Sequence, residues 1–163
     1  LTGQRIGETL AARWGEFDLA AELWRIPPEN TKSNRPHLVH LPTLAVELLR
    51  ALPGEKPAAG FVFAAEGTDK PAPVERRVVT RALDRLLASG ALPLPHFTPH
   101  DLRRTVRSRL SDLGVLPHVA EKILAHRLGG VLQVYDRAEY LPERAAAMAA
   151  WDAKLRELLA DEH

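Results

Sequence analysis

Apolar side chains recur at intervals of three and four residues in six segments of the chain, which is the pattern of amphipathic helices. These segments cover residues 3–14, 43–52, 74–88, 98–113, 119–124 and 141–159. Two short runs, Leu23–Ile26 and His37–Leu41, have a β-type composition and are separated by a polar, proline-rich turn. The pattern predicts a mainly α domain with a small antiparallel β-sheet.

Several helix ends are marked by residues that favour a start. Thr98 precedes Pro99 and lies three residues before Asp101, which predicts a capped helix beginning at residue 98. Thr43 is expected to cap the helix over 43–52. The buried stripe is expected at Leu102, Val106, Leu110 and Leu113 in the helix over 98–113, and at Ile6, Leu10 and Trp14 in the helix over 3–14. Residues 53–73, rich in Pro, Gly and Ala, are expected to form a long loop.

Composition narrows the class of protein. A length of 163 residues, with 45% hydrophobic and 26% charged residues, is that of a single globular domain. The chain has no Cys, which excludes a disulfide scaffold, a Cys-ligated metal and a thiol nucleophile, and fits a cytosolic protein. No segment has the apolar length of a membrane span. Because the chain opens on Leu1, inside an apolar pattern, we interpret it as a piece of a longer protein.

A net charge of +1 conceals a strongly basic region. Residues 74–109 contain eight Arg and no Lys against three acidic residues, whereas residues 136–163 carry a net negative charge. Arg binds phosphate bidentately through its planar fork, so this excess favours a phosphate-bearing partner. A solvated helical face is the alternative interpretation.

Individual residues could act on a phosphate. Arg5 lies near a predicted helix start, where it and free backbone N–H groups can hold an anion, although a simple pair with Glu8 is also open. Lys32 lies in the predicted hairpin turn and can protonate a leaving alkoxide, or it is only a solvated charge. His100 and Arg103 share a helix face, where they can bind a phosphodiester and exchange a proton with it. The alternative is a structural His beside a solvated Arg.

A second constellation follows near the end of the chain. His126 precedes Tyr135 by nine residues, and a Gly-Gly loop between them lets the chain fold back. A dense cationic site would activate the phenol as a nucleophile; otherwise Tyr135 is a partly buried aromatic. Neither of the His pairs at short spacing is completed by a carboxylate cluster, so no metal site is expected. The sequence also contains no phosphate-binding loop of the P-loop type and no nucleophile elbow.

The order Arg, hairpin Lys, His-x-x-Arg, His, Tyr resembles the catalytic domain of the tyrosine recombinase (phage integrase) family. The segments Thr2-Gly3-Gln4-Arg5-Ile6-Gly7-Glu8 and Leu124-Ala125-His126 resemble integrases of prophages and genomic islands. The resemblance covers essentially the whole chain, residues 1–163. It implies the fold of that family, in which the mainly α domain carries a small antiparallel sheet.

The resemblance also implies a role for each matching residue. Arg5 and Arg103 would grip the scissile phosphate, and Glu8 would support Arg5. Lys32 would be the acid for the leaving 5′ oxygen, and His100 and His126 would be the two family histidines. Tyr135 would be the nucleophile, with Tyr140 as its only rival and Arg104 as the rival of Arg103. Further DNA contacts are expected at Arg35, Arg76, Arg77 and Arg104.

The implied activity is cofactor-free, metal-independent strand transfer through a 3′-phosphotyrosyl intermediate. The implied partners are double-stranded DNA, three further copies of the chain on that DNA, and a directionality factor; this piece alone would be a monomer. Such a protein would be bacterial or phage-encoded and cytoplasmic. The N-terminal core-binding and arm-binding domains would be missing. Residues 141–163 would either dock on a neighbouring protomer or pack against their own chain. A type IB topoisomerase, a non-catalytic DNA-binding relative and a basic helical module are the alternatives.

Overall fold

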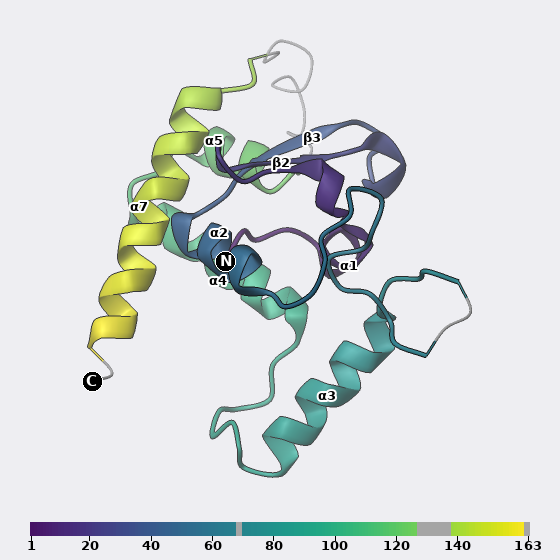
Figure 1. The fold of residues 1–163 in the computed structure, drawn as a ribbon. Coiled ribbons are helices and arrows are strands. Elements are labelled where there is room, and N and C mark those ends of the chain that lie inside the picture. Colours follow the sequence, from purple (N-terminus) through teal and green to yellow (C-terminus); the bar gives the residue numbers. More distant parts are fainter. Residues whose placement is uncertain (68–69, 127–137, 162–163) are drawn as a thin grey trace.

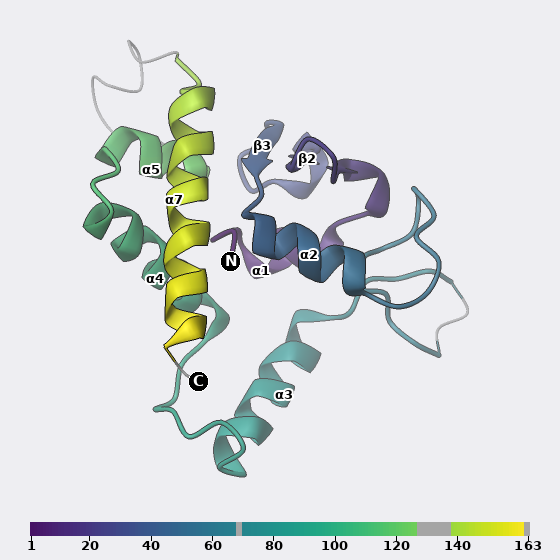
Figure 2. The same cartoon turned by 60° about the vertical axis from the view of Figure 1, so that its left-hand side comes forward.

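The computed structural model describes residues 1–67, 70–126 and 138–161. Figure 2 shows one long helix, α7, with α4 and α5 on one side of it and the sheet and α2 on the other. The helices are α1 (Ile6–Ala11), α2 (Thr43–Ala51), α3 (Arg76–Ala88), α4 (Pro99–Asp112), α5 (Pro117–Ile123) and α7 (Leu141–Ala160), with 3₁₀ turns at Trp14–Glu16 and Pro28–Asn30. The strands are β1 (Phe17–Asp18), β2 (Leu23–Ile26) and β3 (His37–His40). The predicted mainly α fold with a small antiparallel sheet is confirmed.

The sheet is antiparallel in the order β1-β2-β3, and one of its faces builds the first core. Trp24 pairs with Val39, and both side chains are buried together with Ile26. The Trp24 indole N–H donates to the Glu16 carboxylate at 2.8 Å, which satisfies its polar edge. The predicted strand pair is confirmed to within one residue. The two-residue strand β1 was not predicted, because so short a segment shows no alternation of its own.

A second core lies where α4, α5 and α7 meet. Val106 and Leu110 from α4 pack with Ile123 from α5 and with Met148 and Trp151 from α7. All five side chains are almost inaccessible to water. This core also holds the beginning of the chain against α7, because the Trp151 indole N–H donates to the Leu1 carbonyl at 2.7 Å.

Helix α7 is tied to its own domain by buried polar contacts as well as by apolar ones. The Arg144 guanidinium is buried and donates to the Leu38 carbonyl on β3. The Asp152 carboxylate accepts the Leu44 backbone N–H at 2.7 Å. The described part of residues 141–163 therefore packs against its own chain, while Leu158 and Leu159 near the carboxyl end of α7 are exposed.

Two predicted helix starts differ in outcome. The capping box at Thr98 is confirmed, since the Asp101 carboxylate accepts the Thr98 backbone N–H at 3.0 Å. The prediction for Thr43 is wrong: Pro42 is the N-cap, and the Thr43 hydroxyl donates to the Glu22 carboxylate instead.

The first helix is shorter than the predicted segment 3–14. Gly3 adopts a φ of +69°, so the chain cannot become helical there. A Cβ at Gly3 would lie 2.8 Å from the Leu124 side chain. The residues before α1 thus run as extended chain pressed against α4 and the end of α5, which brings Arg5 beside them.

The buried face of α4 is also displaced from the predicted one. Val106 and Leu110 are buried as expected, but Leu102 is 56% exposed and Arg103 is 4% exposed. Leu113 is also partly exposed at the helix end. Leu102 lies beside the buried face and lines an apolar depression with Leu48 and Phe63. The polar Arg103 side chain takes the buried place because it finds hydrogen-bond acceptors there.

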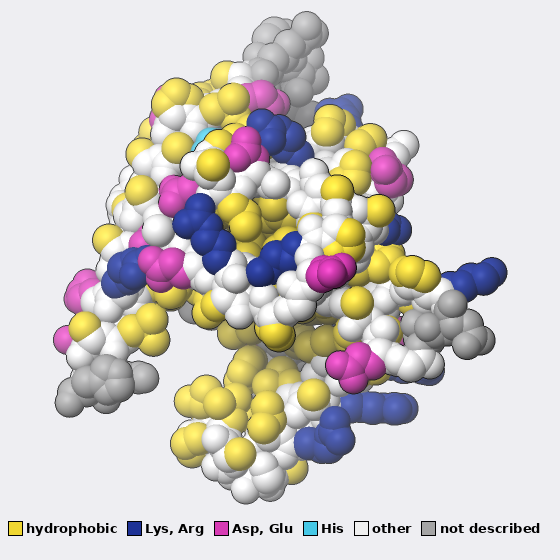
Figure 3. Space-filling model, viewed as in Figure 1, with side chains coloured by type: hydrophobic (Ala, Val, Ile, Leu, Met, Phe, Trp, Pro, Cys, Tyr) yellow, Lys and Arg dark blue, Asp and Glu magenta, His cyan; other side chains and the backbone are white. Residues whose placement is uncertain are grey.

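Helix α3 extends away from the other helices (Figures 1 and 2). None of its residues is fully buried, and Val78 and Leu86 are each about half exposed. Figure 3 shows hydrophobic side chains over this part of the molecule, with Lys and Arg side chains along one side. Only its first turn approaches α1, so α3 contributes one residue, Arg76, to the pocket described next. No helix within the described ranges is long and apolar enough to cross a bilayer.

Candidate active site

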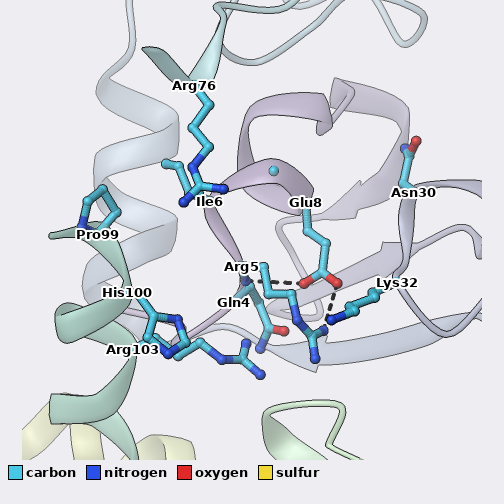
Figure 4. Close-up of a pocket in the computed structure, with 11 residues that line it drawn as sticks. Gln4, Arg5, Ile6, Glu8, Asn30, Lys32, Arg76, Pro99, His100 and Arg103 are labelled. Atoms are coloured by element: carbon cyan, nitrogen blue, oxygen red, sulfur yellow. Dashed lines mark hydrogen bonds and ion pairs between the residues drawn. The ribbon is translucent and has the colours of Figure 1, made fainter. Parts of the chain in front are cut away.

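One polar pocket collects basic side chains from separate parts of the chain (Figure 4). Arg5 directly precedes α1, and Lys32 lies in the β2–β3 connection. Arg76 begins α3, and His100 and Arg103 lie in the first turns of α4. Glu8 is the only acidic residue that lines it within the described part of the chain. The pocket therefore has the electrostatic character of an anion site.

Arg5 both forms its ion pair and faces the pocket, so the two interpretations of this residue are compatible. Its Nη1 lies 2.9 Å from the Glu8 carboxylate, and its backbone N–H donates to the other oxygen of that group at 3.1 Å. The Glu8 side chain is 4% exposed, whereas that of Arg5 is 30% exposed. The buried carboxylate holds the guanidinium in one orientation and leaves further N–H groups for a ligand.

Arg103 is held more rigidly than Arg5. Its Nη1 donates to the Gly3 carbonyl at 2.7 Å, and its Nη2 donates to the Leu124 carbonyl. Burial, followed by the positive charge of Arg5, lowers the pKa of Arg103 to about 10, so the group remains cationic at neutral pH. Its neighbour Arg104 points to solvent with 74% exposure and pairs with Asp101 at 3.5 Å. Of the two adjacent arginines, the structure brings only Arg103 to the pocket.

The carboxyl end of α5 is bound by three side chains from the start of the chain and from α4. The Gln4 amide donates to the Ile123 carbonyl at 3.0 Å, Arg103 donates to Leu124, and Arg5 donates to Ala125 at 3.5 Å. The carboxyl end of a helix is partially negative, which suits these donors. The same residues that form the pocket thus fix the turn that leads to His126. The sequence did not identify Gln4 as a supporting residue, since its role follows from its burial and its contact with Ile123, which only the folded chain shows.

Ala125 closes this turn in a left-handed conformation, with φ +50°. The His126 backbone N–H donates to the Glu121 carbonyl at 2.9 Å and the Ala125 N–H to the Lys122 carbonyl at 3.2 Å, which is the Schellman pattern. A glycine is the usual residue at that position because a Cβ is strained there.

We therefore expect Ala125→Gly to raise the free energy of unfolding by about 0.5–1 kcal/mol, the strain relieved less the added freedom of the unfolded chain. Urea titration measures this difference. Ala150→Gly, at an exposed position within α7, is the matched control and should lower stability by about 1 kcal/mol. A loss of stability in both variants would contradict the strain argument.

His37 supports the same turn from the sheet side. Its Nε2 lies 3.1 Å from the Ile123 carbonyl. Burial first, and then the positive charge of Arg144, lower the pKa of His37 to about 4, so the ring is neutral at neutral pH.

This pKa predicts acid sensitivity. Between about pH 6.5 and about pH 4 the unfolded chain binds a proton at His37 that the folded chain does not, so stability falls as pH falls. The loss is at most about 3 kcal/mol. His37→Gln keeps a donor for the Ile123 carbonyl and should reduce the stability difference between about pH 7 and about pH 4.5 in urea titrations. His96→Gln, whose side chain is 71% exposed, should leave that difference unchanged; equal effects of both substitutions would contradict the assignment.

The two remaining candidates of the family motif are placed differently. His126 does not line the pocket; it follows the turn that Arg5 and Arg103 bind, and its Nδ1 lies 2.5 Å from the Glu121 carboxylate. Tyr135 lies outside the described residues. Its rival Tyr140 is the N-cap of α7, and its ring packs against His118 with centroids 4.6 Å apart and against the second core.

The predicted further DNA contacts divide into two groups. Arg76 lines the pocket, whereas Arg35, Arg77 and Arg104 do not. Arg77 is 69% exposed and pairs with Glu75 at 2.5 Å. No group of three His, Asp or Glu side chains able to hold a metal ion occurs in residues 1–67, 70–126 and 138–161.

Comparison with known proteins places the chain in a family. Residues 1–141 match the model of the phage integrase family. The chain is 35% identical to prophage integrase IntA and 32% identical to prophage integrase IntZ of Escherichia coli (strain K12), over 93% and 98% of its own length. It spans 35% and 38% of the length of these two relatives.

A solved structure shares the fold. The integrase from mycobacterium phage Brujita superposes with a TM-score of 0.69 at 18% identity, covering 91% of this chain and 47% of that one. With the family model matching residues 1–141 and both prophage relatives aligning over nearly all of the chain, this chain belongs to the phage integrase family.

Proposed function

We propose that this chain is the DNA-cleaving part of a site-specific recombinase that integrates a mobile element or prophage. The observation that carries the proposal is the convergence of Arg5, Arg103, Lys32 and His100 on one pocket, next to the turn that precedes His126. A phosphodiester is the ligand that such a cationic pocket favours. Two similar relatives are named prophage integrases, which agrees with integration as the activity.

In the proposed reaction the Tyr135 hydroxyl oxygen attacks a phosphorus of duplex DNA. A bond forms between that oxygen and phosphorus, the bond from phosphorus to the 5′ oxygen breaks, and a 3′-phosphotyrosyl ester results. The phenolic proton passes to His100, and Lys32 gives a proton to the leaving 5′ oxygen. Rejoining is the reverse attack by the 5′ hydroxyl of another strand.

The arginines supply the electrostatic part of the catalysis. The N–H groups of Arg5 and Arg103 that are not used by Glu8, Gly3, Leu124 and Ala125 would donate to the non-bridging oxygens, where charge builds in the transition state. Because both guanidiniums are fixed by protein acceptors before the DNA arrives, little reorganisation is needed. Fixed positive charge here takes the part that a divalent cation plays in other phosphoryl transfers.

Four copies of the chain would act together on two duplexes. Exchange between two duplexes cuts four strands, and each chain offers one Tyr135, so four active sites are required. The exposed Leu158 and Leu159 at the end of α7 are available for contacts between copies.

Covalent capture tests the proposal. Duplexes with a randomised core, selected for attachment to the protein, supply a cleavable sequence. A version nicked just beyond the scissile phosphate releases its short 5′-hydroxyl fragment and traps the adduct. We expect an SDS-stable adduct linked to a 3′ phosphate, formed equally well with EDTA present. Failure to recover any adduct from the selection would contradict the proposal.

A further inference from the structure

The carboxylate of Glu121 links two side chains outside the pocket. Its Oε2 lies 2.5 Å from Nδ1 of His126, and its Oε1 accepts a hydrogen bond from Nε of Arg107 at 2.8 Å. Arg107 is held in turn by Ser111, since its Nη1 donates to that hydroxyl at 2.6 Å. The chain of contacts therefore runs from α4 through α5 to His126.

The charge state of Glu121 favours this arrangement. Burial by itself would raise the pKa of Glu121, but the hydrogen bonds from Arg107 and His126 outweigh it and hold that pKa below its usual value. The group is thus an ionised carboxylate, which only accepts hydrogen bonds. It follows that the hydrogen between the two residues sits on Nδ1 of His126.

We propose that Glu121 is a positioning residue that holds the His126 ring through Nδ1–H and leaves Nε2 for a phosphate oxygen of the DNA. Because phosphate oxygens only accept hydrogen bonds, Nε2 binds one in the protonated ring, in which Nε2 carries a hydrogen as well. The inference rests on the proposed function for its catalytic consequence, but not for the orientation of the ring. Nε2 makes no hydrogen bond to any residue in the described ranges, so it is the nitrogen left to meet a ligand. The hydrogen bond made by one ring nitrogen sets the role of the other.

A purely structural role accounts poorly for this pair. The turn at the end of α5 is already closed by its backbone hydrogen bonds and bound by Gln4, Arg103 and Arg5. The Glu121 and His126 side chains are 26% and 39% exposed, and ion pairs that accessible add little stability. The contact instead removes rotational freedom from the imidazole, which a reactive group benefits from.

Nitrogen NMR of the histidine side chains tests the orientation without any DNA. At a pH where the imidazole is neutral, we expect the wild-type His126 ring to carry its hydrogen on Nδ1. In Glu121→Ala the signals should shift towards the Nε2–H form that free imidazole side chains favour. An Nε2–H ring in the wild-type chain would overturn the proposal.

Single-turnover cleavage of the selected duplex tests the consequence. We expect Glu121→Ala to slow adduct formation about tenfold or more, with DNA affinity within about twofold of wild type. Because the effect acts through the imidazole, Glu121→Ala should cost nothing further in a His126→Ala background. Additive losses would overturn the proposal, because they would show that Glu121 acts by another route.

Glu157→Ala is the matched control, since that carboxylate also holds a cation, Lys154, at 2.8 Å but lies on α7. It should change neither the His126 signals nor the cleavage rate. If the NMR result is as expected and the wild-type chain forms no adduct with any DNA, the proposed function fails together with the catalytic role, while the ring orientation stands. If the wild type cleaves and Glu121→Ala cleaves equally fast, only the positioning role is overturned.

Discussion

Tyr135→Phe is expected to reduce formation of the covalent DNA adduct by at least about a thousandfold. The substitution removes the one oxygen that would bond to phosphorus and leaves the ring in place. The cationic groups that would attract the phosphates, Arg5, Arg76 and Arg103 among them, are unchanged, so DNA affinity should stay within about twofold. Adduct trapping on the nicked duplex gives the rate, and a fluorescence anisotropy titration gives the affinity.

Tyr140→Phe is the matched control, because Tyr140 is the only other tyrosine of the chain and lies against His118 and the second core. It should cleave at close to the wild-type rate. Loss of the adduct in Tyr140→Phe with cleavage retained in Tyr135→Phe would assign the nucleophile to the other tyrosine. An unaltered rate in both would refute a tyrosine nucleophile altogether.

Arg103→Lys is expected to slow cleavage by about a hundred- to a thousandfold even though it keeps the charge. The guanidinium spans two carbonyl groups, those of Gly3 and Leu124, and still has N–H groups for a phosphate. A single ammonium lacks this planar fork. One buried carbonyl would be left without its donor, so the free energy of unfolding should also fall by about 1–3 kcal/mol.

Arg104→Lys provides the comparison, because it makes the same change one residue along the same helix, on a side chain that is 74% exposed. Its cleavage rate and stability should stay close to wild type. To separate lost chemistry from lost folding, cleavage is measured at a temperature where denaturant titration shows Arg103→Lys to be folded. A folded Arg103→Lys variant that cleaves at the wild-type rate would show that the fork is not needed.

Local signals predicted the elements that depend on local interactions. The capping box at Thr98 and Asp101 joins residues three apart, and the helix over 98–113 began where it predicted. The strand pair was predicted because β-type runs flank a proline-rich turn. Thr43 shows the limit of such signals, since its hydroxyl donates a hydrogen bond to Glu22, twenty-one residues away, and does not cap its own helix.

The family of the chain was also predicted from the sequence, because the order and spacing of Arg5, Lys32, His100, Arg103, His126 and Tyr135 form a motif that does not depend on knowing the fold. That motif could not show which contacts hold each residue. The face of α4 illustrates this: periodicity placed Leu102 inside, whereas the structure buries Arg103 against the carbonyls of Gly3 and Leu124.

The helical pattern, the hairpin, the basic region and the set of residues that could act on a phosphate all follow from the order of the side chains along the chain. The folded chain adds that Arg5, Arg103 and Gln4 all bind the turn at the end of α5, that Arg104 faces solvent, and that Glu121 contacts His126. The physical reason is that a buried hydrogen bond depends on where its acceptor lies in space. For Gln4, Arg5 and Arg103 the acceptors are backbone carbonyls, up to 120 residues distant along the chain, and every residue type carries one.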